Sequence, residues 1–170
     1  RENQGDPMRR VFKVMREVVE SHPDIEIIYP VHLNPVVQEA ADAILGHHKR
    51  IHLIDPLDVV DFHNLAARSY FIMTDSGGVQ EEAPSLGKPV LVLRDTTERP
   101  EGVEAGTLKL VGTDPTTVKT AMLQLLDDPT EYRRMAEAKN PYGDGHASRR
   151  ILDAILYDFG KIQNRPAPFK

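Results

Sequence analysis

Residues 70–82 read YFIMTDSGGVQEE, and this short sequence indicates the class of fold. The apolar run at 70–73 is typical of a buried strand. Two glycines then allow a sharp turn, and the residues after them favour a helix, which Pro84 should end early. A strand that passes through a tight turn into a helix is the repeating unit of a parallel α/β sheet.

The same alternation extends in both directions along the chain. Apolar runs predict strands, and apolar residues at helical spacing, with Asp58 as a possible N-cap, predict helices. The expected strands are 25–30, 50–55, 70–74, 89–94 and 107–112; the expected helices are 8–19, 36–45, 58–69, 116–126, 130–138 and a closing helix over 146–161. We therefore expect an α/β fold in which helices cover both faces of a parallel sheet.

Composition excludes several classes of function. The 170 residues carry a net charge of -5, so neither duplex nucleic acid nor an anionic membrane is an expected partner. There is no Cys, and the seven His show no metal-ligand spacing, so we expect no metal site. No apolar stretch approaches about 18 residues, which favours a cytoplasmic protein.

Unusual polar residues follow four of the predicted strands. His32 and Asn34 follow the first, 55–58 the second, the glycine turn the third and 94–99 the fourth. Ligands of open α/β sheets bind at the carboxyl ends of the strands, so these loops predict a binding face.

The glycine turn has two open interpretations. Ser76, Gly77 and Gly78 suit an anion bound at helix amides, or they form a plain turn. The pattern is neither a P-loop nor GxGxxG, so no nicotinamide cofactor is indicated. Glu82 lies four residues after Gly78, about 6 Å along the same helix side, where it could accept from a ribose or remain solvated. Glu81 is expected to be a solvated neighbour.

The loop 94–102, RDTTERPEG, carries two arginines. Arg94 or Arg99 could clamp a diphosphate, and Glu98 could orient Arg99 or contact a sugar hydroxyl. A charged surface loop is the alternative interpretation.

Four stretches together resemble one family. YPVHLNP (29–35), NPYGDG (140–145), the opening REN and the long run TDSGGVQEEAPSLGKPVLVLRDTTERPEGVEAGTLKLVGTD (74–114) are similar to the non-hydrolysing UDP-N-acetylglucosamine 2-epimerases. The resemblance extends to about residue 156. It implies the carboxyl-terminal, Rossmann-like half of a GT-B architecture, with a UDP-binding domain over 1–161 and a tail over 162–170.

The family interconverts UDP-GlcNAc and UDP-ManNAc by eliminating and re-adding UDP, without a cofactor. The resemblance implies UDP contacts by Phe62, Ser76, Gly77, Gly78, Glu82 and Arg99. It also implies catalytic roles for Glu98 and Arg99. Arg1, Glu2 and His32 match positions associated with an activating second UDP-GlcNAc.

The family motif reads His-Arg-Arg-Glu-Asn, and this chain starts at the second Arg. We therefore expect that a catalytic His and a central strand between 25–30 and 70–74 are missing, and that the isolated chain does not epimerise. The amino-terminal domain is an expected partner, within a homodimer at full length. A UDP-sugar glycosyltransferase domain and a non-catalytic nucleotide-binding module are the alternatives.

Overall fold

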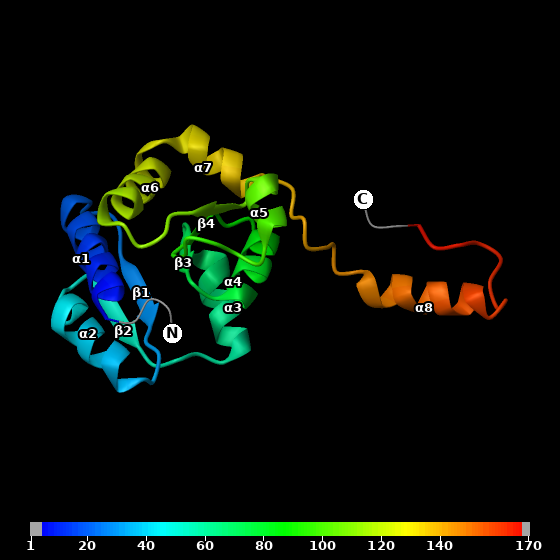
Figure 1. Ribbon diagram of the computed structural model, residues 1–170, viewed down its shortest axis with the longest axis horizontal. Helices are drawn as coiled ribbons and strands as arrows, with labels where there is room; N and C mark the ends of the chain where they lie inside the picture. The colour runs from blue at the N-terminus through cyan, green and yellow to red at the C-terminus, as the bar shows by residue number, and fades with distance from the viewer. Residues whose placement is uncertain (1–4, 168–170) are drawn as a thin grey trace.

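The computed structural model describes residues 5–167 and has an α/β architecture (Figure 1). Its elements are α1 (Asp6–Ser21), β1 (Ile27–Pro30), α2 (Pro35–Leu45), β2 (Ile51–Ile54), α3 (Val59–Arg68), β3 (Ile72–Thr74), α4 (Gly77–Glu82), the 3-10 turn η1 (Ala83–Leu86), β4 (Val90–Val92), α5 (Pro100–Ala105), β5 (Leu108–Leu110), α6 (Pro115–Asp127), α7 (Pro129–Ala136) and α8 (Ala147–Asp158). The expected strand–helix alternation is confirmed.

The strands form two separate parallel sheets. β1 pairs with β2, and β4 lies between β3 and β5. The prediction that 25–30 does not pair directly with 70–74 is confirmed, because β1 and β3 belong to different sheets. Burial raises the pKa of Tyr29 in β1, and the charge of Asp75, just after β3, raises that pKa further.

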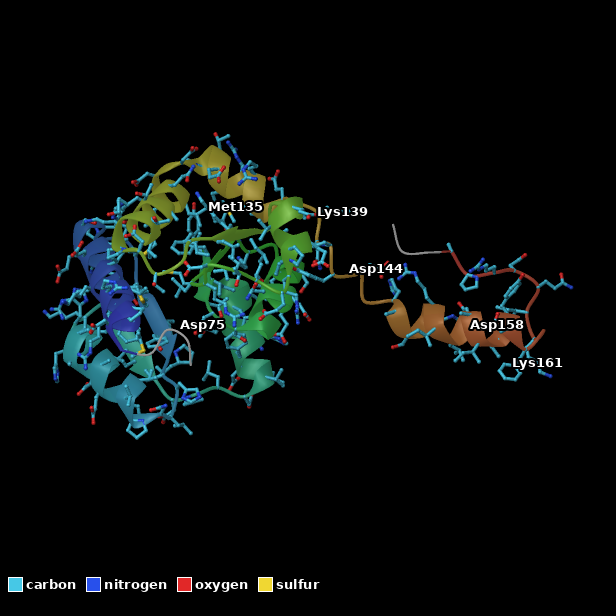
Figure 2. The ribbon with its side chains drawn as sticks, viewed as in Figure 1. Asp75, Met135, Lys139, Asp144, Asp158 and Lys161 are labelled. Carbon is cyan, nitrogen blue, oxygen red and sulfur yellow. The ribbon has the colours of Figure 1, made fainter. Side chains whose placement is uncertain are left out.

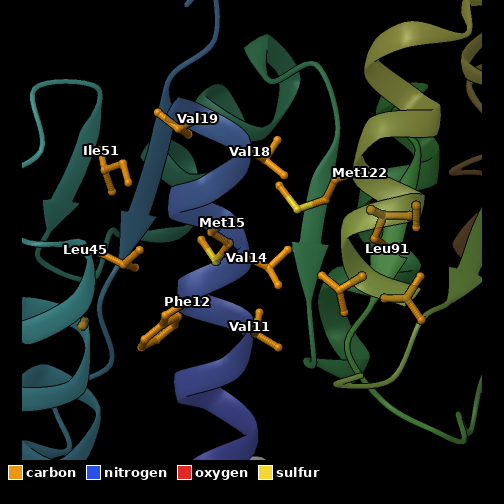
Figure 3. Close-up of a cluster of buried hydrophobic side chains, with 14 of the residues drawn as sticks. Val11, Phe12, Val14, Met15, Val18, Val19, Leu45, Ile51, Leu91 and Met122 are labelled. Atoms are coloured by element: carbon orange, nitrogen blue, oxygen red, sulfur yellow. The ribbon is translucent and has the colours of Figure 1, made fainter. Parts of the chain in front are cut away.

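Helix α1 joins the two sheets into one core (Figure 3). Six of its side chains are buried, in two adjoining groups that face different neighbours. Phe12, Met15 and Val19 lie towards α2 and β2, and Val11, Val14 and Val18 lie towards Leu91 and Met122. Each such side chain contributes about 1.5–3 kcal/mol when it is fully buried. The core therefore continues between the sheets, although among residues 5–167 no strand of one sheet pairs with a strand of the other.

Local signals set several helix starts. The side chain of Asn34 accepts a hydrogen bond from the amide of Val36 at 3.0 Å, and Asp58, as predicted, accepts from Asp61 at 2.9 Å. These caps satisfy amides that have no partner within their helix. Pro84 ends α4 early, as expected, and Gly87 closes η1 with φ +66°. The caps place the loops at the carboxyl ends of the strands.

Helix α5 was not expected, because residues 94–102 were interpreted as a loop. Pro100 begins it and Gly106, with φ +82°, ends it, which are the usual start and stop signals. Gly102 is required by packing, since a Cβ there would lie 2.3 Å from the Tyr142 hydroxyl. The many charged residues of 94–102 indicated a surface loop, although its last residues begin a short helix.

Helix α8 extends from the body of the molecule (Figures 1 and 2). The helix expected over 146–161 is present, but none of its residues is buried, and Ile151, Leu152 and Ile155 remain 48–61% exposed. A bidentate ion pair between Arg150 and Asp144, at 2.7 and 2.6 Å, fixes its start. Among residues 5–167, no helix is both long and apolar enough to cross a membrane.

Candidate functional site

The glycine turn lies between β3 and α4. The amide of Ser76 donates to the Thr74 hydroxyl at 3.0 Å, which closes the turn. Ser76 occupies the N-cap position but makes no capping bond with its side chain. The amides of the first helical turn have no acceptor within the helix, so the turn presents donors outward.

Neither glycine in this turn is needed for the chain's own conformation. Neither has a positive φ. A Cβ added to Gly77 would have the Nη2 of Arg99 as its nearest neighbour, at 4.0 Å, and one added to Gly78 would lie 3.9 Å from the Oε1 of Glu82. Both are ordinary van der Waals distances or longer. Packing within the chain therefore does not require glycine at either position, and the bare backbone lies near both a guanidinium and a carboxylate.

Arg99 is held next to the turn by two contacts. Its Nε donates to Glu81, and its Nη1 donates to the carbonyl oxygen of Glu98 at 3.1 Å. The hydrogen bond to Glu81 raises the pKa of Arg99 above its ordinary value, so the group is cationic. The expectation that Glu81 is only a solvated neighbour is therefore wrong. The Glu81 carboxylate holds the Arg99 guanidinium near the N-terminal end of α4.

Glu98 and Arg94 form the outer part of the same loop. The Nη1 of Arg94 donates to Glu98 at 2.8 Å. The pKa of Glu98 is lowered, first by its own backbone amide and then by the charge of Arg94. Glu98 is thus an ionised, exposed carboxylate, and the side chain that orients the Arg99 guanidinium is Glu81.

Glu82 faces both α3 and the turn. Its Oε2 accepts from the Nε2 of His63 at 3.1 Å, while Oε1 is the atom closest to the Cβ position of Gly78. Phe62, the predicted uracil contact, precedes His63 on α3, is half-buried, and has its ring centre 6.1 Å from the imidazole. Phe62, Gly78 and Glu82 thus lie close together in the structure, and His63, which was not predicted, lies between Phe62 and Glu82.

His32 lies on the loop after β1. It is exposed, and its Nδ1 accepts from the amide of Asn34 at 3.0 Å. Within residues 5–167, its side chain makes no hydrogen bond or ion pair with the glycine turn. Arg1 and Glu2 lie outside the described residues. Across residues 5–167 there is no cluster of three potential metal ligands.

Sequence reasoning missed three residues at this site: His63, Gln80 and Thr97. Gln80 is fully buried on the inner side of α4, and its Oε1 accepts from the Thr97 hydroxyl at 2.6 Å. Helical spacing could have indicated an inward residue at 80. It could not have supplied Thr97 as the partner, because that contact joins α4 to the loop after β4.

The fold and the loops described above define a parallel α/β domain with polar groups gathered where the strands end. The family model for UDP-N-acetylglucosamine 2-epimerase matches residues 1–156, and the chain belongs to this family. The UDP-N-acetylglucosamine 2-epimerase of Bacillus subtilis is 62% identical over 99% of this chain. A putative one from Thermotoga maritima is 53% identical over the same share.

Solved structures agree with this assignment. The S. aureus MnaA–UDP co-structure matches the whole chain with a TM-score of 0.94 and 57% identity. The Neisseria meningitidis UDP-GlcNAc 2-epimerase bound to UDP-GlcNAc matches 92% of it with a TM-score of 0.87 and 44% identity. The chain spans 44% of the length of the two curated relatives and 42–47% of these two structures.

Proposed function

We propose that this chain binds UDP and forms the nucleotide-binding, carboxyl-terminal part of a non-hydrolysing UDP-N-acetylglucosamine 2-epimerase. One observation carries the proposal. A Cβ on Gly77 or Gly78 would meet nothing closer than the Arg99 guanidinium at 4.0 Å and the Glu82 carboxylate at 3.9 Å, so packing within the chain does not require either glycine. Relatives of this chain have been solved with UDP or UDP-GlcNAc bound.

In the proposed complex the diphosphate lies against the turn. The amides of Gly77 and Gly78 and the hydroxyl of Ser76 donate to its oxygens, and Arg99 adds a charge-assisted contact. The nearness of Arg99 to Gly77 supports this arrangement, since one phosphate could contact both.

The nucleoside would lie along α4 towards α3. Glu82 has one oxygen occupied by His63 and the other directed at Gly78, so a ribose hydroxyl next to the diphosphate could donate to Oε1. The half-buried Phe62 on α3 is the proposed backbone contact for uracil. This assignment places the base, the sugar and the phosphates in one line along adjacent elements.

The proposed reaction is an isomerisation of UDP-GlcNAc and UDP-ManNAc without a cofactor. The C2 proton is removed and the anomeric C–O bond breaks, releasing UDP and a bound 2-acetamidoglucal; re-addition of UDP and a proton gives the inverted C2. Arg99 stabilises the charge that develops on the leaving diphosphate. Glu98, ionised at the mouth of the site, is the proposed second catalytic group.

The remaining part of the active site is proposed to come from an amino-terminal domain of the kind that completes the relatives' length. The exposed apolar side chains of Ile151, Leu152 and Ile155 give α8 a surface for packing on that domain. We keep 1–161 as the proposed extent of the UDP-binding domain and 162–170 as a tail. The full-length protein is proposed to be a homodimer, with Arg1, Glu2 and His32 contributing to an activating UDP-GlcNAc site.

Product analysis tests the activity. A protein of the relatives' length, supplied with UDP-GlcNAc and no acceptor, should form UDP-ManNAc, which a glycosyltransferase would not. The isolated 170 residues should bind UDP in calorimetry and form no UDP-ManNAc. Turnover by the isolated chain would contradict the assignment of the proton chemistry to residues outside it, and a need for an acceptor would favour the glycosyltransferase.

A further inference from the structure

Gln80 is the best-buried polar side chain near the site. Among the described residues only Gln80 and Thr107 are polar and buried, and Gln80 is 0% exposed. Its Nε2 donates to the carbonyl oxygen of Ser76 at 3.3 Å, and its Oε1 accepts from the Thr97 hydroxyl at 2.6 Å. Its amide therefore bridges the glycine turn and the loop after β4.

Thr97 continues this connection to Arg99. Its hydroxyl donates to Gln80 and accepts from the backbone amide of Arg99 at 3.0 Å, so both capacities of the hydroxyl are used. The hydrogen bonds run without interruption from Ser76 through Gln80 and Thr97 to Arg99. We call this the Gln80–Thr97 tether.

A buried amide makes such a tether specific. An amide that is removed from water without partners is costly, so Gln80 is stable in this place only when both loops supply their hydrogen-bonding atoms. Glu81, the next residue, binds the Arg99 side chain, so α4 holds both the backbone and the guanidinium of Arg99. The distance between the turn and the cation is thus fixed from within one short helix.

We propose that Gln80 and Thr97 are positioning residues that set the spacing between the glycine turn and Arg99, and so the preference for a nucleoside diphosphate over a monophosphate. This inference rests on the proposed function, because the turn and Arg99 are the groups assigned to the diphosphate. A monophosphate can be bound by either group alone, whereas a diphosphate gains from both only when their spacing is correct.

The test measures the ratio of the dissociation constants for UMP and UDP in the 170-residue chain by calorimetry. Thr97→Val keeps the shape and removes both hydrogen bonds, Thr97→Ser retains them, and Gln80→Met fills the same volume without an amide. We expect Thr97→Val and Gln80→Met each to lower the ratio about tenfold, the effect of losing roughly one hydrogen bond. Thr97→Ser should retain the unsubstituted ratio.

Thr107→Val is the matched control. It removes the hydroxyl of a different, fully buried threonine, which donates to the Gly102 carbonyl at 3.1 Å, but it leaves the tether intact, so the ratio should not change. Because both partners act in one connection, the double variant of Gln80 and Thr97 should lower the ratio no more than either change alone.

An unchanged ratio in both Thr97→Val and Gln80→Met would overturn the tether. An equal weakening of UMP and UDP is one form of this result, and it indicates only a general loss of structure. If the unsubstituted chain fails to bind UDP, both the proposed function and the inferred role of the Gln80–Thr97 tether are wrong. If the chain binds UDP but the variants keep its ratio, only the inferred role of the tether is wrong.

Discussion

The carboxylate of Glu82 provides the sharpest test of where the nucleoside lies. Its two oxygens have different surroundings: Oε2 accepts from His63 at 3.1 Å, and Oε1 is directed at the glycine turn. Glu82→Ala removes both. If a ribose hydroxyl donates to Oε1, the substitution removes a charge-assisted hydrogen bond from the complex.

The size of the effect follows from exposure. A hydrogen bond to a charged group contributes about 1.5–3 kcal/mol. The Glu82 side chain is 48% exposed, so water competes for the carboxylate and the lower end of this range applies. We therefore expect UDP to bind about tenfold more weakly to Glu82→Ala.

Calorimetry with UDP and with its 2′-deoxy analogue separates this contact from a general change of charge. Removing an acid strengthens the binding of any anion, but it strengthens UDP and 2′-deoxy-UDP equally. The ratio of their dissociation constants therefore reports only the contribution of the ribose 2′-hydroxyl. We expect the unsubstituted chain to prefer UDP and Glu82→Ala to lose most of that preference. Glu39→Ala, which removes an exposed acid from α2, is the control and should keep it. An unchanged preference in Glu82→Ala would refute the ribose assignment.

Four further substitutions test other parts of the molecule. Arg99→Lys loses the forked contact that joins Glu81 to a phosphate, so calorimetry should show UDP weakened about tenfold and uridine unchanged. Leu91→Ala empties a site that is 0% exposed in β4, and urea denaturation should show a loss of about 2–5 kcal/mol. The pKa of Glu98 is lower in the folded state than in the unfolded chain, so its stabilisation is present above the unfolded-state pKa and is lost as the pH falls through the folded-state pKa. Glu98→Gln should therefore reduce the acid sensitivity of the urea midpoint. Asp144→Asn weakens the pair with Arg150, so amide exchange at the start of α8 should become faster.

Each of these has a contrary result. Equal weakening of UDP and uridine in Arg99→Lys would remove the phosphate contact. A cost below about 1 kcal/mol for Leu91→Ala would contradict its place in the core. An unaltered acid slope in Glu98→Gln would show that neither the backbone amide nor Arg94 lowers the pKa of Glu98 in solution. Unaltered exchange in Asp144→Asn would show that the pair with Arg150 does not form there.

The local features of the fold were predictable because their causes are local. The caps at Asn34 and Asp58 and the early end of α4 at Pro84 depend on neighbouring residues alone. Helix α5 was missed, although Pro100 and Gly106 marked its ends, because the charges between them resembled a solvated loop.

The sequence by itself determined the alternating α/β architecture, the family resemblance and the residues of the glycine turn. These follow from periodicity, from turn chemistry and from one long continuous motif. Only the tertiary structure decided how the site is supported. It paired Glu81 with Arg99, His63 with Glu82 and Gln80 with Thr97, each across 17 to 19 residues. Such contacts join separate elements, and their distances are set by how α3, α4 and the loop after β4 pack together, which no local pattern records.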